Sequence, residues 1–209
     1  ERLRVVVGAT LGILVTALVC RGIGGSSAGW PWLIAPMGAS AVLVFAVPAS
    51  PLAQPWAVVG GNTLSALVGI ACVRWIGSPE LAAAPAVGLA IGVMFALRCL
   101  HPPGGASALL VALSGVSDPH FLLTPVLVNS LLMVAAGMAY NTATRRAYPH
   151  MQLAAKARGA RDDEADAVDA DLDAVLARYN QVLDVSRDDL KALLQDTQLS
   201  AFQRKLANL

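Results

Sequence analysis

Hydrophobic residues in the first part of the chain fall into six stretches, separated by short polar or Pro- and Gly-containing connections. The stretches cover residues 5–20, 33–47, 56–76, 82–97, 103–113 and 122–140. A helix needs about 20 residues to cross the hydrocarbon core of a bilayer. The third and sixth stretches reach that length, and the first and fourth come close to it. The pattern predicts an all-α polytopic membrane protein.

The second and fifth stretches are shorter than a membrane-spanning helix, and both begin with Pro and Gly. Such stretches are typical of broken or re-entrant elements, which membrane proteins tolerate where protein or a cavity surrounds them. We therefore expect one short or broken helix in each half of the body. Whether these two elements cross the membrane stays open, because four and six crossings both fit the pattern.

Charged residues are rare in this hydrophobic body and common after it. Only five lie between Arg4 and Arg145, namely Arg21, Arg74, Glu80, Arg98 and Asp118. So few charges cannot solvate a soluble domain of this size. Residues 1–150 carry seven Arg against three acids, a net of +4, whereas residues 151–209 carry eight Lys and Arg against eleven acids, a net of −3. We predict a transmembrane domain over residues 1–149 and a charged tail over residues 150–209.

Arginines flank both ends of the hydrophobic body. Arg2 and Arg4 precede the first stretch, and Arg145 and Arg146 follow the last one. Loops that face the cytoplasm are enriched in Lys and Arg. Both termini are therefore expected on the cytoplasmic side, which requires an even number of crossings. In a bacterium this describes a multi-pass protein of the inner cell membrane.

The tail has apolar residues at helical spacing, which predicts a helical cytoplasmic tail. The first set is Leu172, Val175, Leu176, Tyr179, Val182 and Leu183. Ser186 and Asp189 resemble a capping box that opens a second helix, with Leu190, Leu193 and Leu194 on its apolar face. Short helices gain most of their stability from packing against a partner. We therefore expect a homo-oligomer, with a dimer favoured.

The two halves of the body resemble each other. PMGASAVLV at residues 36–44 matches PGGASALLV at residues 103–111, which is 67 positions later (36 to 103), and at the same offset Asn62-Thr63-Leu64 matches Asn129-Ser130-Leu131. This predicts two related three-segment repeats, over about residues 1–76 and 77–149. If all three segments of each repeat cross, the halves are inverted relative to each other, as in many transporters. If the middle segment only dips into the membrane, they are parallel; the pattern favours the inverted arrangement.

The sharpest candidate site is RCLHPPGGAS at residues 98–107. Pro is tolerated at the first helical position because its missing N–H would have no partner there. The residues that follow would present free N–H groups at the positive end of a helix dipole, which suits a small anion. Two such helix ends, facing each other near the bilayer midplane, would form a binding site. Its candidate residues are Pro103, Gly104, Gly105, Ala106 and Ser107 in the second half, and Gly38, Ala39 and Ser40 in the first.

Four further polar residues could serve this site, and each has a plainer alternative. His101 could donate to an anion or shuttle a proton, or it could cap the following helix. Arg98 could attract an anion to the entrance, or it could reach the lipid headgroups. Asn62 and Asn129 could line the path, or they could bond to the main chain of the short elements. The glycines and alanines, for their part, could simply allow close helix packing.

The sequence carries no recognisable catalytic or metal-binding set. Cys20, Cys72 and Cys99 lie far apart in apolar surroundings and have no metal-ligand spacing with a His or another Cys. The acids lie almost wholly in the tail, and no glycine-rich phosphate loop with its Lys occurs. We therefore expect neither an enzyme nor a nucleic-acid-binding protein, and no metal or other cofactor. The expected partners are the lipid bilayer and a small inorganic anion.

The motif His101-Pro102-Pro103-Gly104-Gly105-Ala106 resembles the name-giving motif of the HPP family of integral membrane proteins. The resemblance covers residues 1–149, and the tail around residues 178–190 is similar to the linker of members that continue into a pair of cystathionine-synthase-type (CBS) domains. The resemblance implies four membrane spans. It also implies transport of a small monovalent anion, because plastid and photosynthetic-bacterial members are linked to nitrite uptake. The alternative is a membrane-anchored sensor or scaffold for a cytoplasmic CBS-type module.

Overall fold

The computed structural model describes residues 1–24, 32–150 and 190, and these residues are helical with short connections and no strand. The long helices are α1 (Arg2–Gly24), α3 (Pro55–Ile76), α4 (Pro79–Ala96) and α6 (Val128–Ala143), which continues a π-helical segment η2 (Leu122–Leu127). The short helices are α2 (Pro36–Ala46) and α5 (Pro102–Leu113), and a 3₁₀ turn η1 (Pro51–Ala53) precedes α3. Four of these elements, with η2 and α6 taken as one, are long and apolar enough to span a bilayer. The predicted all-helical, multi-pass membrane fold is confirmed.

Proline and glycine set the bounds of several helices. Helices α2, α3, α4 and α5 each have Pro in the first turn, where its missing N–H leaves no bond unmade. Helix α3 ends at Gly77, whose φ of 73° is in the left-handed region that glycine adopts without strain. Pro79 then starts α4 two residues later. Proline and glycine thus mark helix ends that hydropathy alone would not show.

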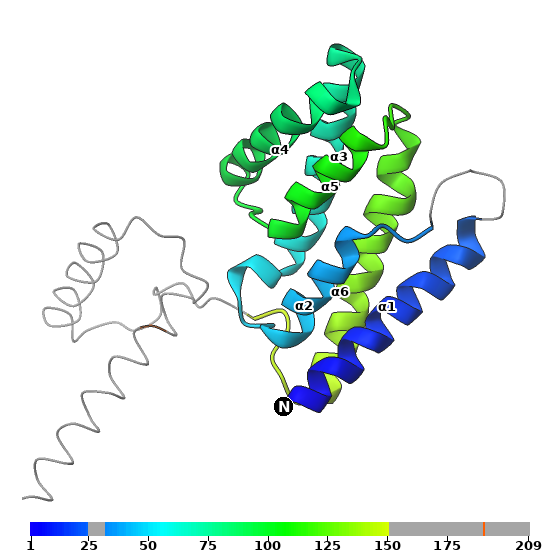
Figure 1. Ribbon diagram of the computed structural model, residues 1–209. Coiled ribbons are helices and arrows are strands. Elements are labelled where there is room, and N and C mark those ends of the chain that lie inside the picture. The colour runs from blue at the N-terminus through cyan, green and yellow to red at the C-terminus, as the bar shows by residue number, and fades with distance from the viewer. Residues whose placement is uncertain (25–31, 151–189, 191–209) are drawn as a thin grey trace, which may run out of the picture. The chain divides into compact units, whose positions relative to one another are not determined.

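In each predicted half of the body, one long and one short helix pack against a long helix of the other half (Figure 1). Helices α1 and α2 pack on α6, whereas α4 and α5 pack on α3. Helix α2 also meets α5, and α3 meets α6. This set of contacts is unchanged if the two predicted halves exchange places. The repeat itself and its inverted orientation stay predictions.

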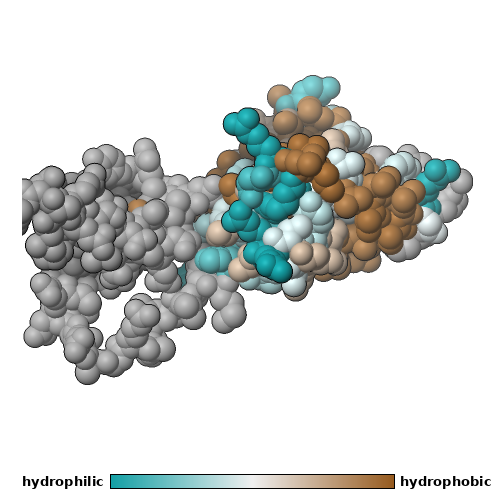
Figure 2. Space-filling view, turned by 90° about the horizontal axis from the view of Figure 1, so that it is seen from below, coloured by the Kyte–Doolittle hydropathy of each residue, from teal (hydrophilic) through white to brown (hydrophobic). Residues whose placement is uncertain are grey.

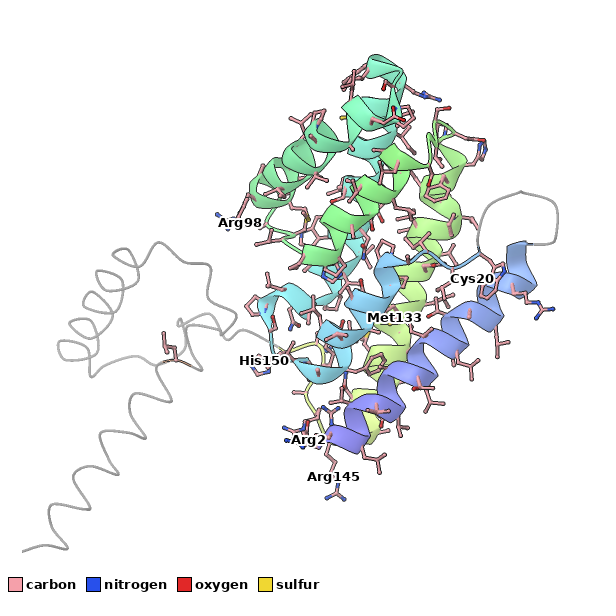
Figure 3. The ribbon with its side chains drawn as sticks, viewed as in Figure 1. Arg2, Cys20, Arg98, Met133, Arg145 and His150 are labelled. Atoms are coloured by element: carbon pink, nitrogen blue, oxygen red, sulfur yellow. The ribbon has the colours of Figure 1, made fainter. Side chains whose placement is uncertain are left out.

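The termini of the described body lie at one end of the bundle, together with the end of α2. The guanidinium of Arg4 donates to the Phe45 carbonyl at 2.9 Å and to Asn141 Oδ1 at 3.0 Å, which joins the starts and ends of three helices. Arg2 and Arg145 extend from the same end (Figure 3). Viewed from that side, hydrophilic residues gather beside a hydrophobic flank (Figure 2). This polar end fits the interface with water.

Hydrogen bonds at both ends of α3 tie it to its neighbours. Trp56 at the start of α3 donates to the Leu97 carbonyl at the end of α4, and Arg74 at the end of α3 donates to the Ser117 carbonyl beyond α5. Helices α2 and α5 have 11 and 12 residues. At about 1.5 Å per residue, each covers roughly half of a hydrocarbon core of about 30 Å. Neither short helix is long enough to span a bilayer alone, and whether these two elements cross the membrane stays a prediction.

The core lies between the helices, and large apolar side chains also cover the outside. Phe45 of α2 and Tyr140 of α6 pack edge to face, with ring centroids 5.7 Å apart. Exposed apolar residues are concentrated on α1 and α4 and include Leu3, Val6, Leu14, Leu18, Leu81, Leu89 and Phe95. Such an extent of apolar surface is unfavourable in water and is covered by acyl chains in a bilayer.

The chain divides into one unit over Glu1–His150 and a second over Met151–Leu209. The helices predicted for residues 172–183 and 186–194, and the acidic run between residues 162 and 173, lie outside the described residues, apart from residue 190. Residues 178–189, which are similar to a CBS linker, also lie outside the described residues.

Candidate binding site at the ends of the short helices

A buried polar cluster joins the N-terminal turns of the two short helices. It consists of Ser40 on α2, Asn62 on α3, His101 just before α5 and Ser107 on α5, all of them buried from solvent. His101 Nε2 lies 2.8 Å from Ser40 Oγ. Asn62 Nδ2 donates to Ser40 Oγ at 3.3 Å, and Ser107 Oγ donates to Asn62 Oδ1 at 2.8 Å. Four residues predicted as candidates from separate parts of the sequence therefore share one hydrogen-bond network.

The contacts of His101 fix the direction of this network. Its Nδ1 lies 2.8 Å from the Leu52 carbonyl oxygen, which can only accept, so Nδ1 carries the proton. In the neutral imidazole Nε2 is then an acceptor, and the Ser40 hydroxyl donates to it. Although His101 occupies the cap position before α5, its ring makes no capping hydrogen bond to that helix. His101 thus caps α5 by its position and its carbonyl, which accepts from the Gly104 N–H at 2.8 Å, while its ring links α5 to α2 and η1.

Both side-chain N–H groups of Asn62 are engaged in this arrangement. Its amide group donates to Ser40 Oγ and to the Val58 carbonyl, and its oxygen accepts from Ser107. Ser107 also lies 3.3 Å from the Pro103 carbonyl oxygen. The network is thus closed upon itself, so a ligand must replace at least one of these internal bonds.

The predicted equivalent of Asn62 has a different set of partners. Asn129 on α6 accepts from the Ile34 N–H at 3.0 Å and donates to the Trp32 carbonyl at 3.0 Å and to Cys20 Sγ at 3.1 Å. It fastens the residues just before α2 to α6, and its hydrogen bonds do not involve the polar cluster. Of the two interpretations offered, bonding to the main chain beside a short helix occurs at Asn129, whereas Asn62 bonds to the two serines and its place in a path stays a prediction.

The backbone groups expected to form an open anion cradle are partly occupied. The Gly104 N–H donates to the His101 carbonyl at 2.8 Å, and the Gly38 N–H donates to the Ala35 carbonyl at 3.0 Å. The expectation that these two N–H groups are free is wrong, because tight turns before both helices use them. Gly38, Ala39 and Ala106 are exposed and Gly105 is partly exposed, on the outer sides of the two helices, whereas Pro103 and Gly104 are buried.

Arg98 lies apart from the polar cluster. It follows α4 in the left-handed region, with φ of 52°, and is exposed. Figure 3 shows its side chain pointing outward from the bundle. An arginine in this position fits attraction of an anion at the surface as well as contact with lipid headgroups.

Most of the chain is similar to a known family of membrane proteins. Residues 1–149 match the family described as HPP, transmembrane region. The chain belongs to the HPP transmembrane family. The resemblance drawn from the motif at residues 101–106 is thereby confirmed.

Two transmembrane proteins of Dictyostelium discoideum are similar to the HPP region. One is 41% identical over 126 residues, which is 56% of this chain and 44% of the relative, and the other is 40% identical over 126 residues, which is 56% of this chain and 40% of the relative. The chain thus spans less than half of the length of these curated relatives. No solved structure matches the chain.

Successive residues of the HPP motif have different structural roles. His101 supplies the ring that bridges the Leu52 carbonyl and Ser40, while Pro102 and Pro103 start α5. Gly104 allows α5 to approach α3, because a Cβ there would lie 2.6 Å from the Gly61 carbonyl oxygen. For Gly104 the close-packing interpretation therefore holds, whereas a Cβ on Gly105 would meet open space.

The acids of the HPP region lie away from the polar cluster. The three carboxylates among residues 1–150 are Glu1, Glu80 and Asp118, and all three lie outside the long helices or in a first turn. Arg4 and Arg146 hold the pKa of Glu1 at about 2, and the backbone N–H and ring of His120 lower the pKa of Asp118. Within the part of the chain that the structure describes, no group of three His, Cys, Asp or Glu side chains could hold a metal ion. The cluster thus offers neutral donors without a nearby negative charge.

Two groups at this site were missed by sequence reasoning. The Leu52 carbonyl acts through the main chain, so no side-chain type could have indicated it. Ser65, one turn after Asn62 on α3, is buried beside Gly104, and only its polarity within a hydrophobic stretch could have drawn attention to it.

Proposed function

We propose that this HPP protein is a transporter or channel for a small monovalent anion, with nitrite as the first candidate, and that the anion binds at the buried polar cluster. The observation that carries the proposal is the direct hydrogen-bonded link between the N-terminal turns of the two short helices through Ser40, Asn62 and Ser107. Helix N-termini carry partial positive charge that favours anions. Short helices that end inside the bundle are a recurrent way to build substrate sites in repeat-based transporters.

The chemistry of the cluster favours an anion over a cation. Hydroxyl and amide groups at the cluster can turn their hydrogens toward a negative ligand, whereas a cation would need carboxylates or several free carbonyl oxygens. Within the described body the carboxylates lie elsewhere. Because the network is closed and buried, the ligand must be small, and its entry must accompany an opening of the contacts around His101.

The orientation of the protein is part of this proposal. The arginines at the end that holds Arg2 and Arg145 fit the cytoplasmic side of a cell membrane, with both termini inside. In a bacterium this would be the inner membrane.

Uptake into proteoliposomes tests the function directly. Purified protein is reconstituted, and entry of nitrite is followed together with nitrate, formate and chloride as competitors. The critical variant is Ser107→Ala, which removes the hydroxyl that donates to Asn62. The matched control is Ser130→Ala, because Ser130 is equally buried but donates only to the Val126 carbonyl, outside the cluster.

We expect nitrite uptake by the wild type and by Ser130→Ala, and a reduction of about tenfold or more in Ser107→Ala, because a hydrogen bond to a charged ligand is lost. Absence of uptake of all four anions by folded wild-type protein would overturn the proposal. That result would favour the role of a membrane anchor for a cytoplasmic module.

A further inference from the structure

Ser65 is a buried hydroxyl without a hydrogen-bond partner next to the polar cluster. The side chain is fully buried, and its Oγ is one of two buried side-chain polar atoms in the described residues with no partner. It lies against the first turn of α5, because a Cβ built on Gly104 would be 2.9 Å from Ser65 Oγ. An unpartnered buried hydroxyl is unfavourable and is rarely retained without a reason.

The position of Ser65 relates it to the cluster rather than to lipid. Ser65 follows Asn62 by three residues, so the two side chains are neighbours on one face of α3. The other unpartnered hydroxyl belongs to Thr63, which at 100° per residue points about 200° away from Ser65 around the helix. Ser65 is therefore the unpartnered hydroxyl that lies on the α3 face toward α5.

The donors of the polar cluster itself are already engaged with one another. Ser107 donates to Asn62, and Asn62 donates to Ser40 and to the Val58 carbonyl. A ligand that arrives at the cluster must compete for these donors, whereas the Ser65 hydroxyl loses no existing bond by turning toward it. A donor that gains a partner only when the ligand is present contributes its full strength to binding.

We propose that Ser65 donates a hydrogen bond to the transported anion, as a binding residue additional to Ser107 and Asn62. This inference rests on the proposed function and names the substrate class more closely. Donors one helical turn apart on α3, together with Ser107 of α5, suit an anion that has two or more acceptor oxygens. Nitrite, nitrate and formate belong to this class, and a single-atom halide uses fewer of the donors at once.

The test compares Ser65→Ala with Ser130→Ala in both stability and transport. Ser65→Ala removes an unpartnered hydroxyl, so its thermal unfolding midpoint in detergent should equal or exceed that of the wild type, while the KM for nitrite rises about tenfold or more. Ser130→Ala removes a bonded hydroxyl, so its midpoint should fall while KM stays within about twofold. A residue with a merely structural role would not raise KM without lowering stability.

Three further measurements test Ser65 without relying on the KM of Ser65→Ala alone. Ser65→Cys keeps the volume and offers only a weak S–H donor, so its KM should lie between those of the wild type and Ser65→Ala. Nitrite should also raise the unfolding midpoint of the wild type more than that of Ser65→Ala. In wild-type liposomes nitrate and formate should compete with nitrite at concentrations about tenfold lower than chloride does, and this preference should shrink in Ser65→Ala.

The outcomes separate the two proposals. If the wild type takes up nitrite and Ser65→Ala has an unchanged KM and an unchanged ligand-induced shift, the assignment of Ser65 is wrong and the proposed function stands. If chloride competes as well as nitrate and formate in the wild type, the substrate class is wrong. If the wild type takes up none of the four anions, both proposals fail.

Discussion

His101 Nε2 lies 2.8 Å from Ser40 Oγ, so the residue that precedes the second short helix is bonded to the second turn of the first one. The same ring reaches the Leu52 carbonyl in η1 at 2.8 Å. One side chain thus connects α5, α2 and the loop that leads into α3. Any movement that separates the two short helices must break this contact, which makes His101 the first residue to consider in how the site opens.

Replacing His101 by Asn and by Gln separates its two contacts. An Asn amide reaches the place of Nδ1 and can keep the bond to the Leu52 carbonyl, whereas a Gln amide reaches the place of Nε2 and can keep the contact with Ser40. Each variant should lose about 1–2 kcal/mol of stability, and His101→Ala about 3 kcal/mol or more because it also leaves a cavity. Nitrite uptake in proteoliposomes should fall more in His101→Asn than in His101→Gln. Equal loss in both would show that the contact with Ser40 has no special part in transport.

Two adjacent glycines of the HPP motif should respond differently to the same substitution. In Gly104→Ala the new methyl would lie 2.6 Å from the Gly61 carbonyl oxygen and 2.9 Å from Met94 Sδ, so α3 and α5 must move apart. We expect a loss of about 1–3 kcal/mol. Gly105→Ala meets no atom within 4 Å and should be neutral or stabilising by up to about 1 kcal/mol. Thermal unfolding of both variants in the same detergent checks this difference, and a similar loss in both would contradict it.

The helices could be predicted because the length of a hydrophobic run in the sequence indicates the length of a helix in the membrane. The stretch at residues 56–76 is α3, and the stretch at residues 103–113 is α5, each within one residue. The pairing of α1 and α2 with α6 was not predictable from these runs. Small residues such as Gly12 allow two helices to approach closely, because a Cβ at Gly12 would lie only 2.5 Å from the Phe45 ring. The sequence does not indicate which helix packs against such a residue.

The cluster was predictable in part because a polar side chain in an apolar helix needs a partner. Asn62 could be selected on that ground, His101 as an ionisable group beside a short stretch, and Ser40 and Ser107 by their matching places at the two predicted helix starts. The different partners of Asn62 and Asn129 could not be predicted, since the two residues are identical and hold equivalent positions in the predicted repeat. Their surroundings differ: at the same offset, His101 of the second half corresponds to Ile34 of the first. Ser65 corresponds to Leu132, so no repeat signal marks it.

The different roles of the two asparagines can be tested by introducing a charge at each. In Asn62→Asp a carboxylate would replace the amide beside Ser40 and Ser107 and repel an incoming anion. At about 4 Å and an effective dielectric of 20, this repulsion is roughly 4 kcal/mol, or about three orders of magnitude in affinity. Nitrite uptake at pH 8 should therefore be lost.

The matched variant Asn129→Asp should act on stability instead. It keeps an oxygen for the Ile34 N–H but faces the Trp32 carbonyl without a donor, so stability should fall by about 1–3 kcal/mol. The KM for nitrite should stay within about twofold of the wild-type value. If Asn129→Asp raises KM as strongly as Asn62→Asp, the two asparagines share a function at the site, and the distinction between them is wrong.

Arg4 and Arg2 offer a matched test of what holds the end of α2. The Arg4 guanidinium donates to the Phe45 carbonyl, where the helix dipole is negative, and to Asn141, which in turn donates to the Val44 carbonyl at 3.0 Å. Arg4→Ala should lower stability by about 2 kcal/mol, and Arg4→Lys should restore little, because an ammonium cannot reach both acceptors in the same plane. Arg2→Ala, at an exposed position, should change stability by no more than about 0.5 kcal/mol.

The pH dependence of the same contact follows from Glu1, whose carboxylate lies 2.7 Å from Arg4 and 2.6 Å from Arg146. Its pKa is lowered from 4.5 to about 2 in the folded protein by these two arginines. The stabilisation is therefore fully present above about pH 4.5 and is lost as the pH falls toward 2. Between pH 8 and pH 6 Glu1 should thus cause no change in the unfolding midpoint with pH, and below pH 4.5 the midpoint should decline less in Glu1→Gln than in the wild type. A decline of equal size in Glu1→Gln would show that other groups cause it.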